Sequence, residues 1–318
     1  MIKNKLTAVL TVAALALTGF VTAPSASAAK KLLGIVTISA SDAGNARVIK
    51  GATAAAKAAG WDVQVIDAQG SAANANAAIK NLVSKKANLI FDLVFPTTSL
   101  GAGLTAANKA TIPVATWGGG LGLGVYMTTG AGAPFAEPAT KLLLKNMGDE
   151  GDILALTYRT GQVCRDREGI FDNMLTGKAG ITVTKNEVTI PGFLQDGAKY
   201  ATAWLARHPA GSGKLAIWGC WEDPTLGAIS ALKQEKRTDV LTYGINGSST
   251  AIKAVQDGSL TATVYEDGVA EGKAMFATGL KALKAGKKWK PVTQNVPGVL
   301  VTADTAADFI AKHPEAMA

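Results

Sequence analysis

Short apolar runs alternate with longer Ala- and Lys-rich segments along most of the chain. The apolar runs are rich in β-branched residues and are bounded by Gly, Pro, Asp or Asn, which is typical of buried strands. In the first half of the chain these runs are 33–38, 63–67, 89–94 and 112–117. The segments between them, rich in helix formers, are 46–59, 72–85 and 101–109. This alternation predicts βαβ units, and therefore a parallel sheet with helices packed on it.

The same pattern starts again in the second half of the chain. Strands are expected at 152–157, 181–190, 215–218 and 240–245, and helices at 166–175, 196–208, 224–233 and 249–257. A strand at 261–265, a helix at 269–285 and a strand at 296–302 follow this second block. The predicted fold class is α/β, with two similar doubly wound parallel-sheet lobes. Because elements remain after the second block, the chain is expected to cross back, giving a multi-strand hinge.

The lobe boundaries follow from these crossings. The Gly-, Thr- and Pro-rich stretch 128–138 is the expected first crossing. We therefore assign 29–127 plus 268–295 to the N-terminal lobe and 128–267 plus 296–318 to the C-terminal lobe. Hinge movement is expected near Met127, Asp267 and Asn295.

The N-terminus has the features of an export signal. Lys3 and Lys5 precede an apolar stretch, and Ala26-Ser27-Ala28 is a small-residue cleavage site. The stretch is too short to span a membrane comfortably, since a span needs about 20 residues. We expect residues 1–28 to be a signal peptide, cleaved near Ala28 or Ala29, and the mature chain to be periplasmic.

Composition excludes several classes of function. The 318 residues are 48% hydrophobic and 18% charged, as in a globular chain of about two domains. Two Cys and two His are too few for a zinc ribbon, so no metal is expected. The formal charge of +8 falls to +6 without Lys3 and Lys5, and the remaining basic residues are dispersed. No nucleic acid is expected as a partner. The Gly-rich run 118–124 does not match a dinucleotide motif, so no cofactor is expected either.

Ligands of open parallel sheets bind beyond the carboxyl ends of the strands, so the residues there form the candidate site. Aromatic side chains at these ends are Phe95, Trp117, Phe193 and Trp221. Polar side chains at the same ends are Asp42, Arg165, Glu222, Asn246 and Glu266. Flat aromatic faces with planar polar groups suit a ligand with apolar C–H faces and a polar rim, such as a sugar ring or a polyol.

Two further features of the strand ends leave alternatives open. Cys164 and Cys220 follow strands that would be neighbours, and they form either a disulfide or two buried thiols. Paired carboxylates among Glu222, Asp223, Glu266 and Asp267 would also allow glycoside processing, although hydrogen bonding to hydroxyls is the simpler interpretation.

Several short motifs in fixed order link the chain to a known family. They lie at 50–52, 60–63, 112–114, 165–171, 226–228, 244–247 and 254–258. Over nearly all of 31–302 the chain resembles the periplasmic sugar-binding proteins of ABC importers, the ribose-binding-protein-like group or type I periplasmic binding proteins. The resemblance implies a monomeric receptor, not an enzyme, that closes around a small carbohydrate or polyol. It also implies delivery of that ligand to an ABC transporter permease.

The resemblance also implies positions for the ligand contacts. Those carried over residue by residue are Asp42 with nearby Asn45, Phe95, Arg165 as the first arginine of Arg-x-Arg, Phe193, Asn246 and Glu266.

Three departures from the family pattern change the expected site. Trp117-Gly118-Gly119-Gly120 replaces an Asp-Arg pair, Trp221-Glu222 replaces an Asn-Asp pair, and Glu266 replaces a glutamine. We therefore expect a site that is more aromatic and more acidic than a pentose site. Such a site would suit a larger sugar, a polyol or a cationic derivative such as an amino sugar.

Overall fold

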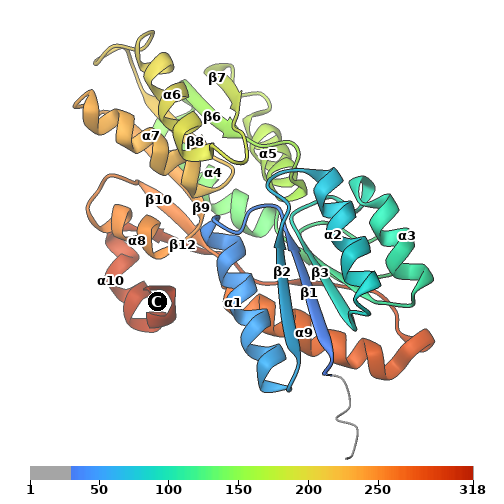
Figure 1. The fold of residues 1–318 in the computed structure, drawn as a ribbon. Coiled ribbons are helices and arrows are strands. Elements are labelled where there is room, and N and C mark those ends of the chain that lie inside the picture. The colour runs from blue at the N-terminus through green and yellow to red at the C-terminus, as the bar shows by residue number, and fades with distance from the viewer. Residues whose placement is uncertain (1–29, 318) are drawn as a thin grey trace, which may run out of the picture.

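The computed structural model describes residues 30–317, and the predicted signal peptide, residues 1–28, lies outside them. The described chain forms two lobes, each built on its own six-stranded sheet (Figure 1). The sheet of the N-terminal lobe has, in spatial order, β11 (Val292–Asn295), β5 (Val125–Gly130), β4 (Val114–Trp117), β3 (Leu89–Leu93), β1 (Leu32–Thr37) and β2 (Asp62–Asp67). All of its strand pairs are parallel.

The sheet of the C-terminal lobe repeats this arrangement. Its strands, in spatial order, are β12 (Val299–Thr302), β10 (Ala262–Tyr265), β9 (Val240–Asn246), β8 (Leu215–Gly219), β6 (Glu150–Thr157) and β7 (Gly180–Glu187). Only β12 runs antiparallel to its neighbour, with Tyr265 opposite Val299. The two sheets confirm the predicted fold class of two doubly wound lobes.

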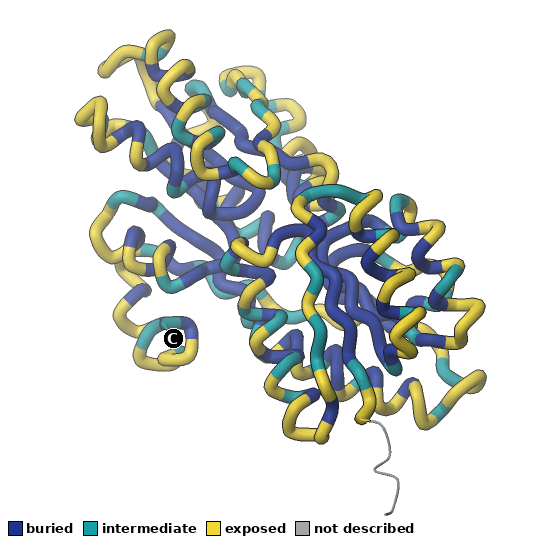
Figure 2. The backbone as a smooth tube through the Cα atoms, viewed as in Figure 1, coloured by how far each residue is buried: buried dark blue, intermediate teal, exposed yellow. Residues whose placement is uncertain are grey.

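Helices cover the sheets, so the central strands are buried, as the dark blue tube segments in Figure 2 show. The helices of the N-terminal lobe are α1 (Ala43–Ala58), α2 (Ala72–Ser84), α3 (Gly101–Lys109) and α9 (Gly268–Ala285). Those of the C-terminal lobe are α4 (Ala133–Met147), α5 (Gln162–Leu175), α6 (Phe193–Leu205), α7 (Glu222–Gln234), α8 (Ser249–Gln256) and α10 (Ala303–Lys312). Helices α1 and α9 pack side by side. Gly272 permits this packing, since a Cβ there would lie 2.1 Å from the carbonyl oxygen of Val48.

Four elements were not predicted from the sequence. Strand β5 and helix α4 occupy most of the stretch interpreted as a crossing, and β11 and α10 lie near the C-terminus. The proposed boundary at residue 127 falls inside β5, so the first crossing follows Gly130. Pro134 lies at the start of α4, where its missing N–H costs nothing, and Pro138 lies one turn later. A high proline content was therefore compatible with a helix at this point.

The chain passes between the lobes three times, after β5, after β10 and after β11. The second passage runs from Tyr265 to Gly268, where Asp267 caps α9 by accepting a 2.9 Å hydrogen bond from the Ala270 N–H. These passages turn the carboxyl ends of the strands of both lobes toward each other.

Candidate functional site

A cavity lies between the lobes, at the carboxyl ends of their strands. The space between its walls, including the part open to solvent, is about 370 Å³. The N-terminal lobe contributes Ile38, Asp42, Asn45, Val94 and Trp117 to its walls. The C-terminal lobe contributes Tyr158, Val163, Cys164, Arg167, Ile190, Trp221 and Asn246. Both lobes therefore form one site.

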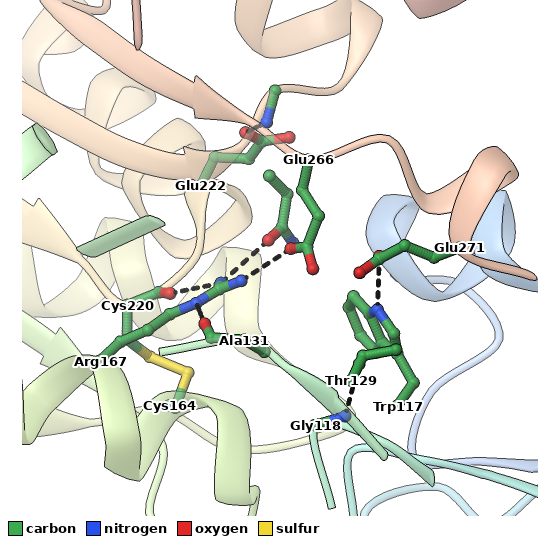
Figure 3. Close-up of polar contacts among 12 residues, drawn as sticks. Trp117, Gly118, Thr129, Ala131, Cys164, Arg167, Cys220, Glu222, Glu266 and Glu271 are labelled. Atoms are coloured by element: carbon green, nitrogen blue, oxygen red, sulfur yellow. Dashed lines mark hydrogen bonds and ion pairs between the residues drawn. A yellow bond between two sulfur atoms is a disulfide. The ribbon is translucent and has the colours of Figure 1, made fainter. Parts of the chain in front are cut away.

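Arg167 is the central charged residue of this site. Its Nε donates to the carbonyl oxygen of Ala131 at 2.8 Å, and its Nη1 donates to the carbonyl oxygen of Cys220 and to Oδ1 of Asn246, both at 2.9 Å. Its Nη2 donates to Oε2 of Glu266 at 2.9 Å, and both side chains are 1% exposed. Figure 3 shows the guanidinium group held among these acceptors. Most N–H groups of the Arg167 side chain thus donate to acceptors within the protein itself.

Arg165, the arginine predicted to bind the ligand, lies outside the cavity, so that assignment is corrected. It is exposed at the surface of α5 and donates a hydrogen bond to Oε1 of Gln162. Residues two positions apart in a helix point to different sides, about 200° apart. The buried residues of α5 that share one face are Val163, Cys164, Arg167 and Phe171. Helical periodicity therefore could have selected the second arginine of the Arg-x-Arg pair.

Glu222 and Glu266 do not line the cavity, and both support its walls. The Glu222 carboxylate accepts from the N–H groups of Gly247 at 2.6 Å and Ser248 at 2.7 Å, and from Oγ1 of Thr263 at 2.9 Å. It thereby fixes the loop that follows β9. Burial raises the pKa of Glu266, and the Arg167 guanidinium opposes that rise. The extra acid that the sequence suggested for the ligand is thus already paired.

Trp117 lines the N-terminal side of the cavity. Its Nε1 donates a 2.7 Å hydrogen bond to Oε2 of Glu271 in the first turn of α9 (Figure 3). Burial, together with the nearby charge of Glu266, raises the pKa of Glu271 well above its usual range. Glu271 was not predicted as a site residue, because it does not directly follow a predicted strand and is close to Trp117 only in space.

The other predicted aromatic residues divide into two groups. Trp221 lines the cavity and meets Tyr158 and Phe193 edge to face, with ring centroids 6.0 and 5.7 Å apart. Phe193 lies on the groove outside the cavity, where it supports Trp221. Phe95 is fully buried in the core and does not line the cavity. Position after a strand therefore identified Trp221 correctly as a lining residue but not Phe95.

Asp42 and Asn45 line the cavity at the start of α1, as predicted. Oδ1 of Asp42 caps the helix by accepting a 2.7 Å hydrogen bond from the Asn45 N–H. The Asn45 side chain donates from Nδ2 to the carbonyl oxygen of Ser39 at 2.9 Å, and its buried Oδ1 has no partner among residues 30–317. Burial, together with the Glu222 charge, raises the pKa of Asp42.

The two lobes touch on both sides of the cavity. Arg47 of α1 donates hydrogen bonds to the carbonyl oxygens of Asn246 and Gly247 in the C-terminal lobe. The Gln162 N–H donates to the carbonyl oxygen of Val94 at 3.0 Å. Val94 has a φ of 82°, a strained value for a β-branched residue, which directs this carbonyl to the opposite lobe. The cleft is therefore closed.

Cys164 and Cys220 form a disulfide, which resolves the alternatives left open by the sequence. The bond joins the first turn of α5 to the end of β8, 56 residues further along the chain. It lies beside Arg167, whose Nη1 bonds the carbonyl oxygen of Cys220 (Figure 3). The disulfide thus fixes the C-terminal wall of the cavity.

Four apolar lining residues were not identified from the sequence: Ile38, Val94, Val163 and Ile190. Ile38, Val94 and Ile190 are the last residues of predicted strands, where apolar side chains are more often part of the core.

Within residues 30–317, no group of three or more His, Cys, Asp and Glu side chains is placed to hold a metal ion. Among the same residues, no helix combines the length and apolar character needed to cross a membrane.

The sequence of this chain matches a protein-family model and individual known proteins. The family model described as "Periplasmic binding protein domain" matches residues 33–288. The ribose import binding protein of Haemophilus influenzae is 26% identical over 257 residues, which cover 74% of this chain and 80% of that protein. A putative rhizopine-binding protein of Rhizobium meliloti is 28% identical over 179 residues, covering 55% of this chain and 56% of that one.

Solved structures share the fold. An ABC transporter solute-binding protein from Agrobacterium vitis with bound allitol superposes with a TM-score of 0.81 at 24% identity, covering 89% of this chain and 99% of that one. A solute-binding protein from Bacillus halodurans with bound myo-inositol gives 0.77 at 19% identity, covering 89% and 98%. The two facing lobes and the family match over both of them place this chain in the periplasmic binding protein family.

Proposed function

We propose that this protein is an exported receptor that captures a small carbohydrate or polyol between its lobes and delivers it to an ABC importer. The observation that carries the proposal is the closed cavity between Trp117 and Trp221, with polar side chains from both lobes. Aromatic faces pack against the C–H faces of a sugar ring, while Asp42 and Asn45 accept hydrogen bonds from its hydroxyl groups. Relatives named for ribose import and structures with bound allitol or inositol support the same class of ligand.

The binding residues that we propose are those that line the cavity: Asp42, Asn45, Trp117, Arg167, Trp221 and Asn246. Phe193, Glu222 and Glu266 act indirectly, by holding Trp221, the loop after β9, and Arg167. Closure of the lobes removes the ligand from water and gives the importer a distinct shape to recognise.

We propose binding without catalysis. A glycosidase needs two free carboxyl groups about 5–10 Å apart across the scissile bond. Of the four acids considered for that role, Glu222, Glu266 and Asp267 are hydrogen-bonded to groups of the protein. The amino-sugar alternative rested on a free Glu266 carboxylate, and its pairing with Arg167 removes that support.

A thermal-shift screen with sugars and polyols, followed by calorimetric titration of the hits, tests the proposal. The expected result is one-site binding near micromolar affinity, about −8 kcal/mol, with the ligand recovered unchanged. Release of reducing sugar would instead favour the enzyme, and the absence of any carbohydrate or polyol hit would contradict the proposal.

Cleavage after residue 28, a periplasmic location and a monomeric state are also expected. Mass spectrometry, cell fractionation and light scattering, respectively, check these three expectations.

A further inference from the structure

The polar side chains around the cavity have little hydrogen-bonding capacity left for a ligand. Arg167 has five N–H donors, and four of them already meet protein acceptors. Oδ1 of Asn246 is taken by Arg167, and Oδ1 of Asp42 by the Asn45 N–H. The indole N–H, the only side-chain donor of Trp117, already donates to Glu271.

What remains free is a small set of groups. Oδ1 of Asn45 and Nε1 of Trp221 are buried without a partner among residues 30–317. One N–H of Arg167 and the Asn246 amide nitrogen complete the set. Because each hydroxyl both donates and accepts, these groups satisfy about two or three hydroxyl groups. A fully hydroxylated monosaccharide carries more than that.

Apart from the Tyr158 hydroxyl group, the rest of the wall is apolar and comes from both lobes. Val94 and Tyr158 meet beside Gly161, where a Cβ would lie 2.8 Å from Cγ1 of Val94 and 3.2 Å from Cδ1 of Tyr158. Val163 packs on the backbone of Gly118 in the opposite lobe, where a Cβ would lie 2.3 Å from its Cγ2. Ile190 continues this surface. A ligand hydroxyl placed here would lose its hydrogen bonds to water and gain none.

We propose that the ligand is a methyl-bearing carbohydrate or polyol, either a deoxy sugar or an O-methylated cyclitol, whose methyl group packs against Val94, Val163 and Ile190. This inference rests on the proposed function and narrows its ligand class. The hydroxyl groups on the opposite side of the ligand meet Asn45, Trp221 and the remaining N–H of Arg167.

Matched pairs of compounds test the proposal by calorimetric titration. The pairs are L-rhamnose with L-mannose, L-fucose with L-galactose, and D-pinitol with D-chiro-inositol, which differ in one methyl or hydroxyl group each. We expect at least one methyl-bearing member to bind, and to bind at least about tenfold more tightly than its hydroxylated partner. Equal or tighter binding of the hydroxylated member in the pairs that bind would overturn the proposal.

A panel of ribose, allitol and myo-inositol separates this proposal from the function itself. If these polyols bind and no methyl-bearing compound does, the methyl proposal is wrong while the receptor function stands. If no compound of either kind binds, both are wrong.

A substitution in the apolar wall of the cavity gives a second test of the proposal. Val163→Thr keeps the shape of the side chain and adds a hydroxyl group, so the preference for the methyl-bearing member should fall by about tenfold. Val65→Thr, at a half-exposed position on the outer strand β2, is the matched control and should leave the preference unchanged. An unchanged preference in Val163→Thr would show that this wall does not contact the methyl group and would overturn the assignment.

Discussion

The indole Nε1 of Trp117 donates a 2.7 Å hydrogen bond to Oε2 of Glu271, although the two residues lie 154 positions apart. Glu271 stands in the first turn of α9, just after the chain passes from the C-terminal to the N-terminal lobe. One acid beside this passage therefore sets the orientation of an aromatic wall of the cavity. Because the bond is buried, its loss leaves the indole N–H without a partner.

Glu271→Ala should weaken ligand binding by about tenfold, since Trp117 then loses its fixed orientation. Glu271→Gln should retain most of the affinity, because an amide oxygen can accept the same hydrogen bond. Calorimetric titration measures both values, and near-ultraviolet circular dichroism reports the indole environment. Equal losses in the two variants would show that the charge, and not the hydrogen bond, is what matters.

Gly44→Ala should disfavour closure of the cleft. A Cβ at this position would lie 2.7 Å from Nδ2 of Asn246 in the opposite lobe, while alanine suits the helical backbone of α1. We expect affinity to fall by about tenfold and small-angle scattering to show a more open molecule with ligand present. Gly169→Ala is the matched control, because a Cβ there has no neighbour within 4 Å. A scattering profile and affinity unchanged in Gly44→Ala would contradict the closed geometry.

The two arginines of α5 should behave in opposite ways. Arg165→Ala should leave affinity and stability nearly unchanged, since its side chain is exposed. Arg167→Ala should lower the free energy of unfolding by about 3–5 kcal/mol, because Glu266 would be left buried and unpaired. The double variant Arg167→Met with Glu266→Gln should recover much of that loss. Urea denaturation of the three variants and the wild type measures these differences, and a double variant no more stable than Arg167→Ala would argue against the pair.

The sequence predicted the fold well because its strands are short, β-branched and regularly spaced. The strands it missed carry weaker patterns: β11 is exposed along its whole length, and β5 follows a Gly-rich loop rather than a helix. Periodicity detects burial on one face, so an exposed edge strand gives little pattern to detect.

Within the site, the sequence identified residues by their position after strands but could not tell which of them face the ligand. Asp42, Asn45, Trp117, Trp221 and Asn246 line the cavity. Other predicted residues have partners far away in the chain, as Glu222 does with Thr263. Whether a polar group is free or already paired depends on such long-range contacts, which no local pattern contains.

The disulfide should contribute to stability more than to binding. Closing a loop of 56 residues stabilises a fold by about 4 kcal/mol in the chain-entropy model. The double variant Cys164→Ala, Cys220→Ala should therefore unfold at a lower urea concentration, and its free energy of unfolding should depend more steeply on denaturant because the unfolded chain is less constrained. A thiol titration that finds two reactive thiols in the unfolded, unreduced wild-type protein would contradict the bond.

Ligand affinity should fall as the pH rises, because closure buries two acids that face each other across the cleft. Asp42 belongs to the N-terminal lobe and Asp223 to the first turn of α7, and they are 7% and 8% exposed. Burial raises the pKa of both carboxyls above the ordinary value of 3.8, and for Asp223 the charge of Asp42 adds to the rise. Glu222 raises both pKa values further, while Arg47 and Arg167 oppose the rise at Asp42.

Carboxyl groups with a raised pKa in the closed form bind more protons there than in an open, hydrated cleft. Closure is then most favourable at low pH and weakens as the pH rises from near 3.8 through the closed-state pKa values. Titrations between pH 4 and pH 8, in buffers of different ionisation enthalpy, measure both the affinity and the proton uptake. Asp223→Asn should flatten the profile and reduce the uptake, whereas Asp62→Asn, at an exposed position of β2, should leave both as in the wild type. Binding that takes up no protons in the wild-type protein would mean that the acid pair is already formed before the lobes close.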